Sequence, residues 1–317
     1  MKESNFNPLV SIIIPVYNGS NYVEEAINCA LNQTYKNIEV IVVNDGSTDD
    51  DATEKACLKY GDKIHYYLKE NGGCASALNY AITKTNGEFI SWLSHDDLYT
   101  NDKIEKQITM YTTHHLDPKS TIISNPSILI DKDGKKIFHP KKVGKGLYTP
   151  IESFKYLLFK RCFNGCGLLI PKTVFDNFHL SFNEEYKFLL DWELWLEMAL
   201  NGFSFYLDRE LLVKNRVHSM QVTAKQKDLH QKEITLIIEK FLHNNTVLNI
   251  ENKQFILELY YFAYNHHLEC SEKYLSLLKQ ENIKINIFRR WYLTTKKNFF
   301  RFMKNIYRKV LRRGKNK

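Results

Sequence analysis

The chain has 317 residues, with 44 Lys and Arg against 36 Asp and Glu and a formal net charge of +8. A hydrophobic share of 44% with 25% charged residues is typical of a globular protein and excludes collagen-like or largely disordered sequence. No apolar run reaches the ~18 residues that a transmembrane helix needs, and the first residues lack the basic-then-apolar pattern of a signal peptide. We therefore expect a cytoplasmic protein.

The positive charge is concentrated at the carboxyl terminus. Residues 281–317 hold 13 basic residues and one acidic residue, whereas the other 280 residues hold 31 basic and 35 acidic residues. The chain therefore combines a slightly acidic body with a basic tail, and we consider the function of each separately.

The first hundred residues alternate between strand and helix patterns. Short β-branched runs that end in turn residues predict buried strands, and apolar residues at three- and four-residue spacing predict helices. The expected strands are 9–14, 38–43, 64–68 and 88–93, and the expected helices are 22–31, 49–60 and 75–83. This alternation predicts an α/β fold with a doubly wound, mostly parallel sheet flanked by helices.

The rest of the chain is mixed and then helical. We expect strands at 121–130, 165–170 and 211–213, a hairpin turn at 131–134, and helices at 151–161, 189–200, 228–243, 252–267, 271–280 and 286–312. These patterns suggest an α/β domain over residues 1–224, a helical extension over 225–284 and a basic amphipathic helix over 285–317.

Polar clusters follow three of the first four expected strands, at 15–19, 44–49 and 94–97. In a doubly wound sheet, ligands bind at the carboxyl ends of the strands. The adjacent carboxylates of Asp96 and Asp97 repel each other unless a cation lies between them, and oxygen ligands of this kind suit Mg²⁺ or Mn²⁺. The alternative is that both residues cap the next helix. No glycine-rich phosphate-binding motif is present, which disfavours a dinucleotide oxidoreductase or a P-loop ATPase.

The ordered motifs resemble those of the inverting glycosyltransferases of family 2, which have the GT-A fold. The resemblance covers roughly residues 8–223 and implies a Rossmann-like GT-A domain that binds a nucleotide-sugar donor. It is carried by PVYNG (15–19), NDGSTDD (44–50), KENGGCASALNYAI (69–82), GEFISWLSHDD (87–97), LDWELWLEMA (190–199) and RVHSMQVT (216–223).

The resemblance implies a donor site in the amino-terminal half. Asp45 would accept a hydrogen bond from the base N–H, because an ionised carboxylate is only an acceptor. The alternative for Asp45 is an Asx-turn residue before Gly46. Many relatives carry Asp where this chain has Asn44. The residues that the resemblance assigns to donor binding are Pro15, Tyr17, Asn18, Asp45, Asn71, Gly72, Ser94, His95 and Asp96.

A metal site is implied at Ser94-His95-Asp96, which occupies the position of the family's DxD triplet. Serine replaces the first aspartate, so Asp96 is the expected principal ligand of Mn²⁺ or Mg²⁺. Asp97 and His218 are the other expected ligands, and His95 is interpreted as a spacer.

The catalytic base implied by the resemblance is Asp191. An inverting transfer is a single displacement, so one carboxylate on the acceptor side suffices to take the hydroxyl proton. Relatives often carry Glu where this chain has Leu190. The alternative for Asp191 is a charge that stabilises a helix amino terminus. Arg216 and His218 stand where relatives bind the diphosphate, which both side chains suit chemically.

The basic tail has the pattern of an amphipathic helix. Its apolar residues from Trp291 to Val310 recur at three- and four-residue spacing, and Lys and Arg fall on the opposite face. We expect residues 285–317 to lie on an anionic membrane surface. The alternatives are packing against the helical extension and nucleic-acid binding; we expect no nucleic-acid partner.

Together these patterns predict an inverting glycosyltransferase at the inner face of the plasma membrane, held there peripherally. It would move a sugar, by default from a UDP-sugar, to a hydroxyl of a lipopolysaccharide, capsule or lipid-linked glycan acceptor. Because of Ser94 and Leu190, the first alternative is a degenerate, non-catalytic homologue that binds sugar nucleotides. The second is a nucleic-acid-binding protein that uses the basic tail.

Overall fold

The computed structural model describes residues 6–138, 144–160, 163–217, 227–242, 253–265 and 271–280. The chain divides into two compact units, Met1–Ile234 and Thr235–Lys317. The domain boundary expected at residue 224, the last expected helix and the basic segment 285–317 lie outside the described residues.

The amino-terminal part follows the expected alternation of strands and helices. Each expected element is present within three residues of its expected start. The elements are β1 (Val10–Val16), α1 (Val23–Leu31), β2 (Ile38–Asn44), α2 (Ala52–Leu58), η1 (Gly61–Lys63), β3 (His65–Leu68), α3 (Cys74–Ile82), β4 (Phe89–Trp92), β5 (Leu98–Tyr99) and α4 (Lys103–Thr113).

The described residues from 121 to 242 add short strands and four α-helices, the last of which continues into the second unit. The strands β5, β8, β9 and β11 and the short helix α6 are not among the expected elements. The elements are β6 (Thr121–Ser124), β7 (Ser127–Ile130), β8 (Lys136–Phe138), β9 (Gly146–Tyr148), α5 (Pro150–Lys160), η2 (Gly165–Gly167), β10 (Leu168–Pro171), α6 (Thr173–Asp176), α7 (Leu190–Leu200), β11 (Ser204–Leu207), β12 (Val213–Arg216) and α8 (Lys227–Leu242).

The central sheet has the strand order β3-β2-β1-β4-β10-β6-β11-β9 among the described residues. Strands β3, β2, β1 and β4 pair in parallel, β11 pairs in parallel with β6, and β10 and β9 run antiparallel to their neighbours. The fold is therefore α/β with a mainly parallel sheet, as expected. The parallel strands β1, β2 and β4 bring their carboxyl ends to one edge.

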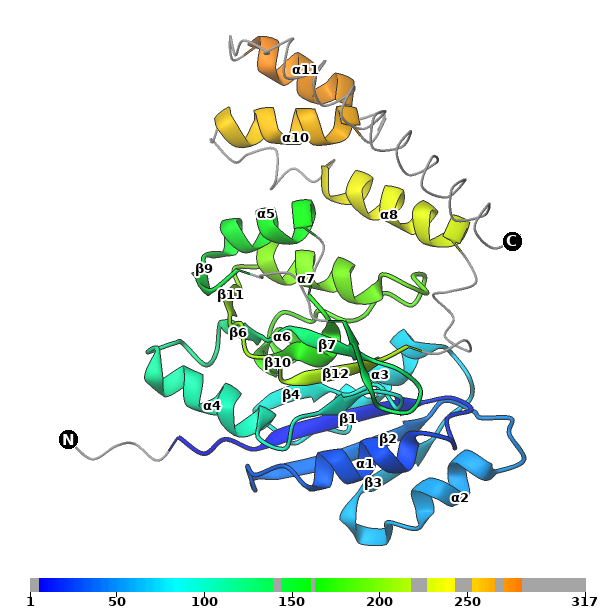
Figure 1. The fold of residues 1–317 in the computed structure, drawn as a ribbon. Coiled ribbons are helices and arrows are strands. Elements are labelled where there is room, and N and C mark those ends of the chain that lie inside the picture. Colours follow the sequence, from blue (N-terminus) through cyan, green and yellow to red (C-terminus); the bar gives the residue numbers. More distant parts are fainter. Residues whose placement is uncertain are drawn as a thin grey trace, which may run out of the picture. The chain divides into compact units, whose positions relative to one another are not determined.

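Apolar residues on alternate positions of β1 build the main core. Val10, Ile12 and Ile14 are fully buried and belong to the same cluster as the inward residues of α1, α2 and α4. Figure 1 shows α3, α5 and α7 on the side of the sheet opposite α1. Both faces of the sheet are covered, which explains why its inner strands are continuous apolar runs.

The single strand expected over residues 121–130 is wrong. The structure has two strands there, β6 in the central sheet and β7 in a second sheet of order β5-β12-β7-β8. Asn125 and Pro126 separate them; Pro126 has no N–H for a ladder, and the buried Asn125 side chain bonds to Gln107 and Asp208 instead. The expected hairpin turn connects β7 to β8.

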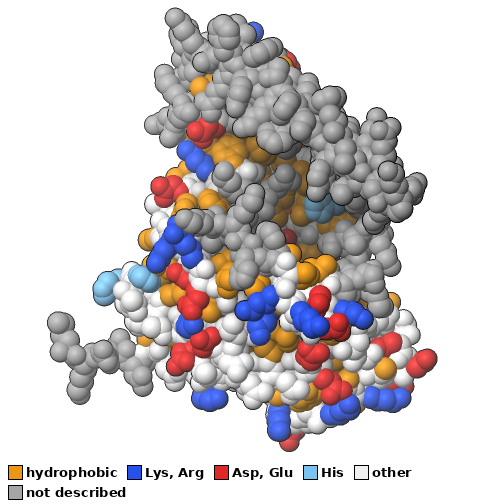
Figure 2. All heavy atoms as spheres, in the orientation of Figure 1, with side chains coloured by type: hydrophobic (Ala, Val, Ile, Leu, Met, Phe, Trp, Pro, Cys, Tyr) orange, Lys and Arg blue, Asp and Glu red, His pale blue; other side chains and the backbone are white. Residues whose placement is uncertain are grey.

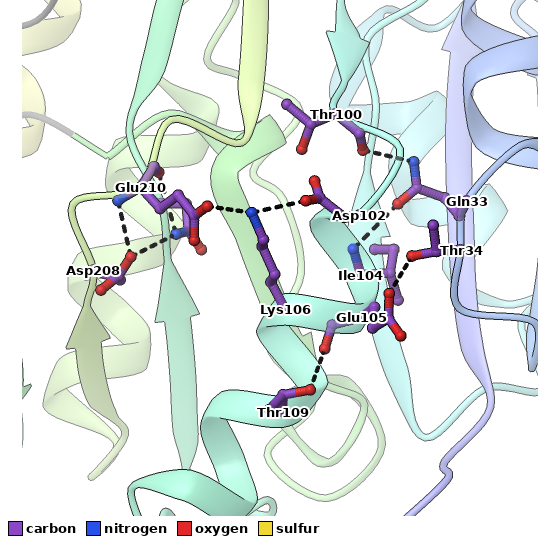
Figure 3. Close-up of polar contacts among 11 residues, drawn as sticks. Gln33, Thr34, Thr100, Asp102, Ile104, Glu105, Lys106, Thr109, Asp208 and Glu210 are labelled. Atoms are coloured by element: carbon purple, nitrogen blue, oxygen red, sulfur yellow. Dashed lines mark hydrogen bonds and ion pairs between the residues drawn. The ribbon is translucent and has the colours of Figure 1, made fainter.

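Helix α4, which follows the 94–97 turn, is anchored on two sides (Figure 3). Gln33, just after α1, donates to the Thr100 carbonyl at 2.9 Å and accepts from the Ile104 N–H at 3.2 Å. On the other side, Lys106 forms ion pairs with Asp102 and with Glu210 of the segment before β12. These contacts fix the segment that leads out of the expected metal-binding turn.

The second unit contains the end of α8 together with α10 (Lys253–Asn265) and α11 (Ser271–Gln280). Phe255, Leu259 and Tyr260 of α10 and Tyr274 and Leu278 of α11 are buried, and the two helices pack against each other. Across the described residues, no helix is long and apolar enough to cross a membrane.

Candidate functional site

The turns after β1 and β2 are joined by hydrogen bonds. The Asn18 side chain accepts from the Thr48 N–H at 2.7 Å, and the Asn18 N–H donates to Ser47 Oγ at 2.9 Å. Asn18 has a φ of 49°, a left-handed conformation that asparagine tolerates better than most residues. Pro15 is buried in β1, whereas Tyr17 is 46% exposed, so its ring presents an apolar surface at this edge of the sheet.

Asp45, directly after β2, accepts hydrogen bonds from the turn that follows β3. Its buried carboxylate lies 2.7 Å from the Lys69 ammonium and accepts from the N–H groups of Gly72 and Gly73, the latter at 2.7 Å. The Asn71 side chain donates to the Asp45 carbonyl at 2.8 Å. One anion therefore organises both turns, and the structure brings Asp45, Asn71 and Gly72 together.

The 94–97 turn after β4 packs against the turn after β1. A Cβ atom added at Gly19 would lie 2.4 Å from His95 Cδ2, so only glycine fits at this position. The N–H and Oγ of Ser94 both lie 3.4 Å from the Cys166 thiol. The serine that replaces the first aspartate of the triplet thus faces a cysteine from η2.

Asp97 is a buried carboxylate that connects this turn to β12. It accepts from the Arg216 N–H at 2.8 Å, from the Asn215 side chain at 2.5 Å and from the Cys166 thiol at 3.4 Å. Burial raises the pKa of Asp97, and the negative charge of Asp96 raises it further. These donors give Asp97 a structural role in the described residues, and its role as a metal ligand stays a prediction.

The Arg216 guanidinium is enclosed, with 2% of its side chain exposed. It donates to the carbonyls of Asp96 at 2.9 Å and Lys132 at 2.8 Å and to the Glu25 carboxylate at 2.8 Å. Its Cζ lies 4.4 Å from the centre of the Tyr22 ring. Arg216 therefore connects the 94–97 turn to α1, and direct contact with a diphosphate stays a prediction.

Asp191 lies in the first turn of α7. Its Oδ1 accepts from the Trp192 N–H at 2.7 Å. Burial raises the pKa of Asp191 to about 6, although this hydrogen bond acts in the opposite direction. A carboxylate with a raised pKa is a stronger base than an ordinary aspartate, as a group that takes a proton from a hydroxyl requires.

Cys74 is the first residue of α3 and lies within electrostatic range of three expected site residues. Although Cys74 presents surface to solvent, the pKa of its thiol is raised to about 12. Desolvation by the surrounding protein is the main cause, and the charges of Asp191, Asp45 and Asp96 add to it, in that order of strength. Three expected site residues from separate elements therefore lie within electrostatic range of the amino terminus of one helix. Cys74 is not among the site residues predicted from the sequence, although it directly follows the predicted turn at Asn71-Gly72-Gly73.

Comparison with known proteins shows the family of this chain. Residues 11–146 match the model of the family described as glycosyl transferase family 2. An uncharacterized glycosyltransferase of Rickettsia typhi is 48% identical over 223 residues, which cover 70% of this chain and 68% of the relative. The chain belongs to glycosyltransferase family 2. This is a family of transferase enzymes, as the motifs predicted.

Other relatives of this family 2 chain are longer. An uncharacterized glycosyltransferase of Rickettsia bellii is 46% identical over 77% of this chain, which spans only 35% of that relative's length. Chondroitin synthase of Pasteurella multocida is 28% identical over 78% of this chain, which spans 25% of the synthase. The chain therefore corresponds to one part of these larger proteins.

Solved structures of low identity share the GT-A fold of this family 2 chain. S. aureus TarS, in complex with UDP-GlcNAc, has a TM-score of 0.63 at 20% identity and covers 81% of this chain and 72% of the TarS chain. The mannosyltransferase PcManGT of Pyrobaculum calidifontis, in complex with GDP-Man and Mn²⁺, has a TM-score of 0.58 at 17% identity. The match covers 93% of this chain and 81% of the PcManGT chain.

The residues present suit a divalent cation only together with substrate oxygens. No group of three His, Cys, Asp or Glu side chains among the described residues forms a cation site, and His218 lies outside them. Mg²⁺ and Mn²⁺ are commonly held by one or two carboxylates plus substrate phosphates and water. Asp96, in the 94–97 turn after β4, is a carboxylate of this kind, and its role as a ligand of a cation shared with a diphosphate stays a prediction.

The surface of the first unit carries both signs of charge. Figure 2 shows acidic and basic side chains interspersed over the described part of one face of the molecule.

Proposed function

We propose that this chain transfers a sugar, with inversion, from a nucleotide-sugar donor to a hydroxyl group of a surface-glycan acceptor. The observation that carries the proposal is that Asp45 accepts hydrogen bonds from Gly72 and Gly73 just before α3, while the charges of Asp96 and Asp191 also act on Cys74, the first residue of that helix. This arrangement combines a base-binding carboxylate, a cation ligand and a general base in one site. The fold shared with structures that contain UDP-GlcNAc or GDP-Man supports a nucleotide-sugar donor.

In the proposed reaction, the acceptor hydroxyl attacks the anomeric carbon while the nucleoside diphosphate leaves on the opposite face. Asp191 takes the hydroxyl proton, for which its pKa of about 6 is suited near neutral pH. The turns at 15–19 and 69–73 hold the nucleoside, with Asp45 accepting from the base. Mn²⁺ or Mg²⁺, bound through Asp96 and proposed to contact His218, would offset the charge of the leaving diphosphate.

The test is a screen of UDP- and GDP-sugars with Mn²⁺ or Mg²⁺, which measures release of nucleoside diphosphate in the presence of glycan acceptors. With the active donor, Asp191→Asn should lower kcat by at least about 10²-fold while the affinity for UDP or GDP stays within about threefold. The matched control is Asp176→Asn, which removes an exposed carboxylate paired with Lys172. Wild-type turnover by Asp191→Asn would contradict the assignment of the base, and no turnover with any donor would favour a degenerate homologue.

We also propose that residues 285–317 bind the inner face of the plasma membrane, with a lipopolysaccharide, capsule or lipid-linked glycan as the acceptor. The support is the amphipathic sequence pattern and the 13 basic residues over 281–317. The relative named chondroitin synthase supports a glycan acceptor. Sedimentation with vesicles that contain phosphatidylglycerol should recover the full chain and not a chain truncated before Ile285, whereas equal recovery would contradict this proposal.

A further inference from the structure

The segment that leads to Asp191 is held at its start by α3. The Asn79 side chain accepts from the Phe182 N–H at 2.9 Å and donates to the Phe182 carbonyl at 2.9 Å. The same amide also donates to the Glu184 carboxylate at 3.2 Å. This reciprocal pair fixes the backbone of Phe182 in the way that a strand neighbour would.

The end of the same segment is held by one carboxylate from α8. Glu233 Oε1 accepts from the Lys187 N–H at 2.8 Å, and Oε2 accepts from the N–H groups of Phe188 and Leu189 at 3.0 and 3.1 Å. Glu233 is 3% exposed. Three successive backbone donors therefore converge on a single buried anion, immediately before α7 begins.

A second residue of α8 contacts this segment. The ring centres of His230 and Phe188 are 6.1 Å apart in an edge-on arrangement. His230 and Glu233 lie three residues apart and therefore on the same face of α8. The contact lies within the first compact unit, although both residues come after the 8–223 region that carries the family motifs.

We propose that Glu233 is a positioning residue for Asp191, so that α8 is part of the catalytic apparatus. This rests on the proposed function of Asp191 as the base. Asp191 follows Leu189 by two residues, so the orientation of the Leu189 backbone sets the direction of the Asp191 side chain. A negative charge at the amino terminus of α7 is also favourable to the helix dipole. A general base displaced by about 1 Å loses much of its effect on the rate.

Glutamine cannot replace Glu233, although it has the same shape. The three N–H groups need acceptors on both carboxylate oxygens, and glutamine has an acceptor on one side and a donor on the other. Glu233→Gln therefore leaves at least one N–H facing an NH₂ group. Because the substitution nearly conserves the volume of the side chain, its effect is confined to these hydrogen bonds.

The experiment compares Glu233→Gln with the wild type in kcat, in affinity for UDP or GDP and in hydrogen exchange over residues 185–191. We expect kcat to fall about 10- to 100-fold, nucleotide affinity to stay within about twofold and exchange at 187–189 to increase. Glu272→Gln, the same substitution at an exposed position of α11, is the matched control and should match the wild type in all three. If Glu233→Gln does not fold, Glu233→Asp, which keeps the charge but shortens the reach, takes its place.

A wild-type kcat despite faster exchange at 187–189 would overturn the proposal, as would an equal loss of kcat and nucleotide affinity with a lower melting temperature. Failure of the proposed function looks different. In that case the wild-type chain turns over no donor, while the exchange comparison still decides whether Glu233 orders the segment before Asp191.

Discussion

The ammonium group of Lys69 lies 2.7 Å from Asp45 Oδ1, and the two side chains are only 17% and 4% exposed. This ion pair differs from the exposed pair of Lys55 and Asp51, whose side chains are 70% and 73% exposed. A buried carboxylate that loses its cation is strongly destabilised in its charged form. Lys69 therefore compensates the buried charge of Asp45 and holds one of its carboxylate oxygens in place.

Replacing Lys69 by Met should weaken nucleotide binding. Without the ammonium, the Asp45 carboxylate loses both its compensating charge and the contact that orients it toward the proposed base. We therefore expect the Kd for UDP or GDP to rise about tenfold, which is about 1.4 kcal/mol. Isothermal titration calorimetry measures this change directly. The control Lys55→Met removes only the exposed pair and should bind as the wild type does. Equal affinities of Lys69→Met and the wild type would show that Asp45 does not depend on Lys69.

The parts of the site that the sequence predicted are local. The turns at 15–19, 44–49 and 94–97 each follow a strand directly, and parallel strands bring such turns to one edge whatever the rest of the fold does. Lys69 and Asp45 are 24 residues apart, but they follow neighbouring strands, so their proximity also follows from the topology.

Contacts that depend on side-chain direction or on distant segments were not predictable. Glu233 reaches the segment before Asp191 from 44 to 46 residues away along the chain, and helical periodicity does not reveal which neighbour its buried face meets. Residues 121–130 alternate as one strand would, yet the buried amide of Asn125 divides them between two sheets. Such outcomes depend on tertiary hydrogen bonds that no local pattern contains.

Arg216 forms an ion pair with Glu25, and a substitution of Glu25 distinguishes two roles of this arginine. If Arg216 holds the 94–97 turn through the Asp96 carbonyl, Glu25→Gln should weaken the binding of Mn²⁺ and UDP about threefold, and Arg216→Lys should weaken it more, because lysine lacks the planar fork. We expect this outcome. Electron paramagnetic resonance of free Mn²⁺ in the presence of UDP measures it without catalysis.

The neighbouring Glu24 supplies the control for this experiment. Glu24 pairs with Lys59 rather than with Arg216, so Glu24→Gln should bind Mn²⁺ and UDP as the wild type does. A direct contact of Arg216 with the diphosphate predicts the opposite for Glu25→Gln, whose affinity would equal or exceed that of the wild type.

The raised pKa of Asp191 predicts how kcat falls at low pH. A base must be ionised to accept a proton, and burial raises the pKa of Asp191 to about 6. We expect kcat to increase about tenfold per pH unit below pH 6 and to level off above it. The residual kcat of Asp191→Asn should not show this fall below pH 6. If the kcat of the wild type fell only near pH 4, Asp191 would be solvated as an ordinary aspartate.

Lys103 of α4 predicts how stability depends on pH. It is fully buried, donates to Ser91 Oγ and to Gln107 Oε1, both at 2.9 Å, and its ammonium lies 4.1 Å from the centre of the Tyr99 ring. Burial lowers the pKa of Lys103 to about 7. Its pKa in the unfolded chain is about 10.4, so between these values the unfolded state binds one more proton than the folded state.

The sign of the effect follows from this difference in bound protons. From pH 7 to pH 10, the free energy of unfolding should rise by up to about 1.4 kcal/mol per pH unit through Lys103, and Lys103→Met should lack this increase. Lys106, one turn further along α4, is the control, because its ion pairs with Asp102 and Glu210 raise its pKa and it stays charged in both states over this range. Urea unfolding at pH 7, 8.5 and 10 measures the free energy of unfolding of the wild type, Lys103→Met and Lys106→Met. Parallel pH profiles for Lys103→Met and Lys106→Met would show that Lys103 is charged in the folded chain.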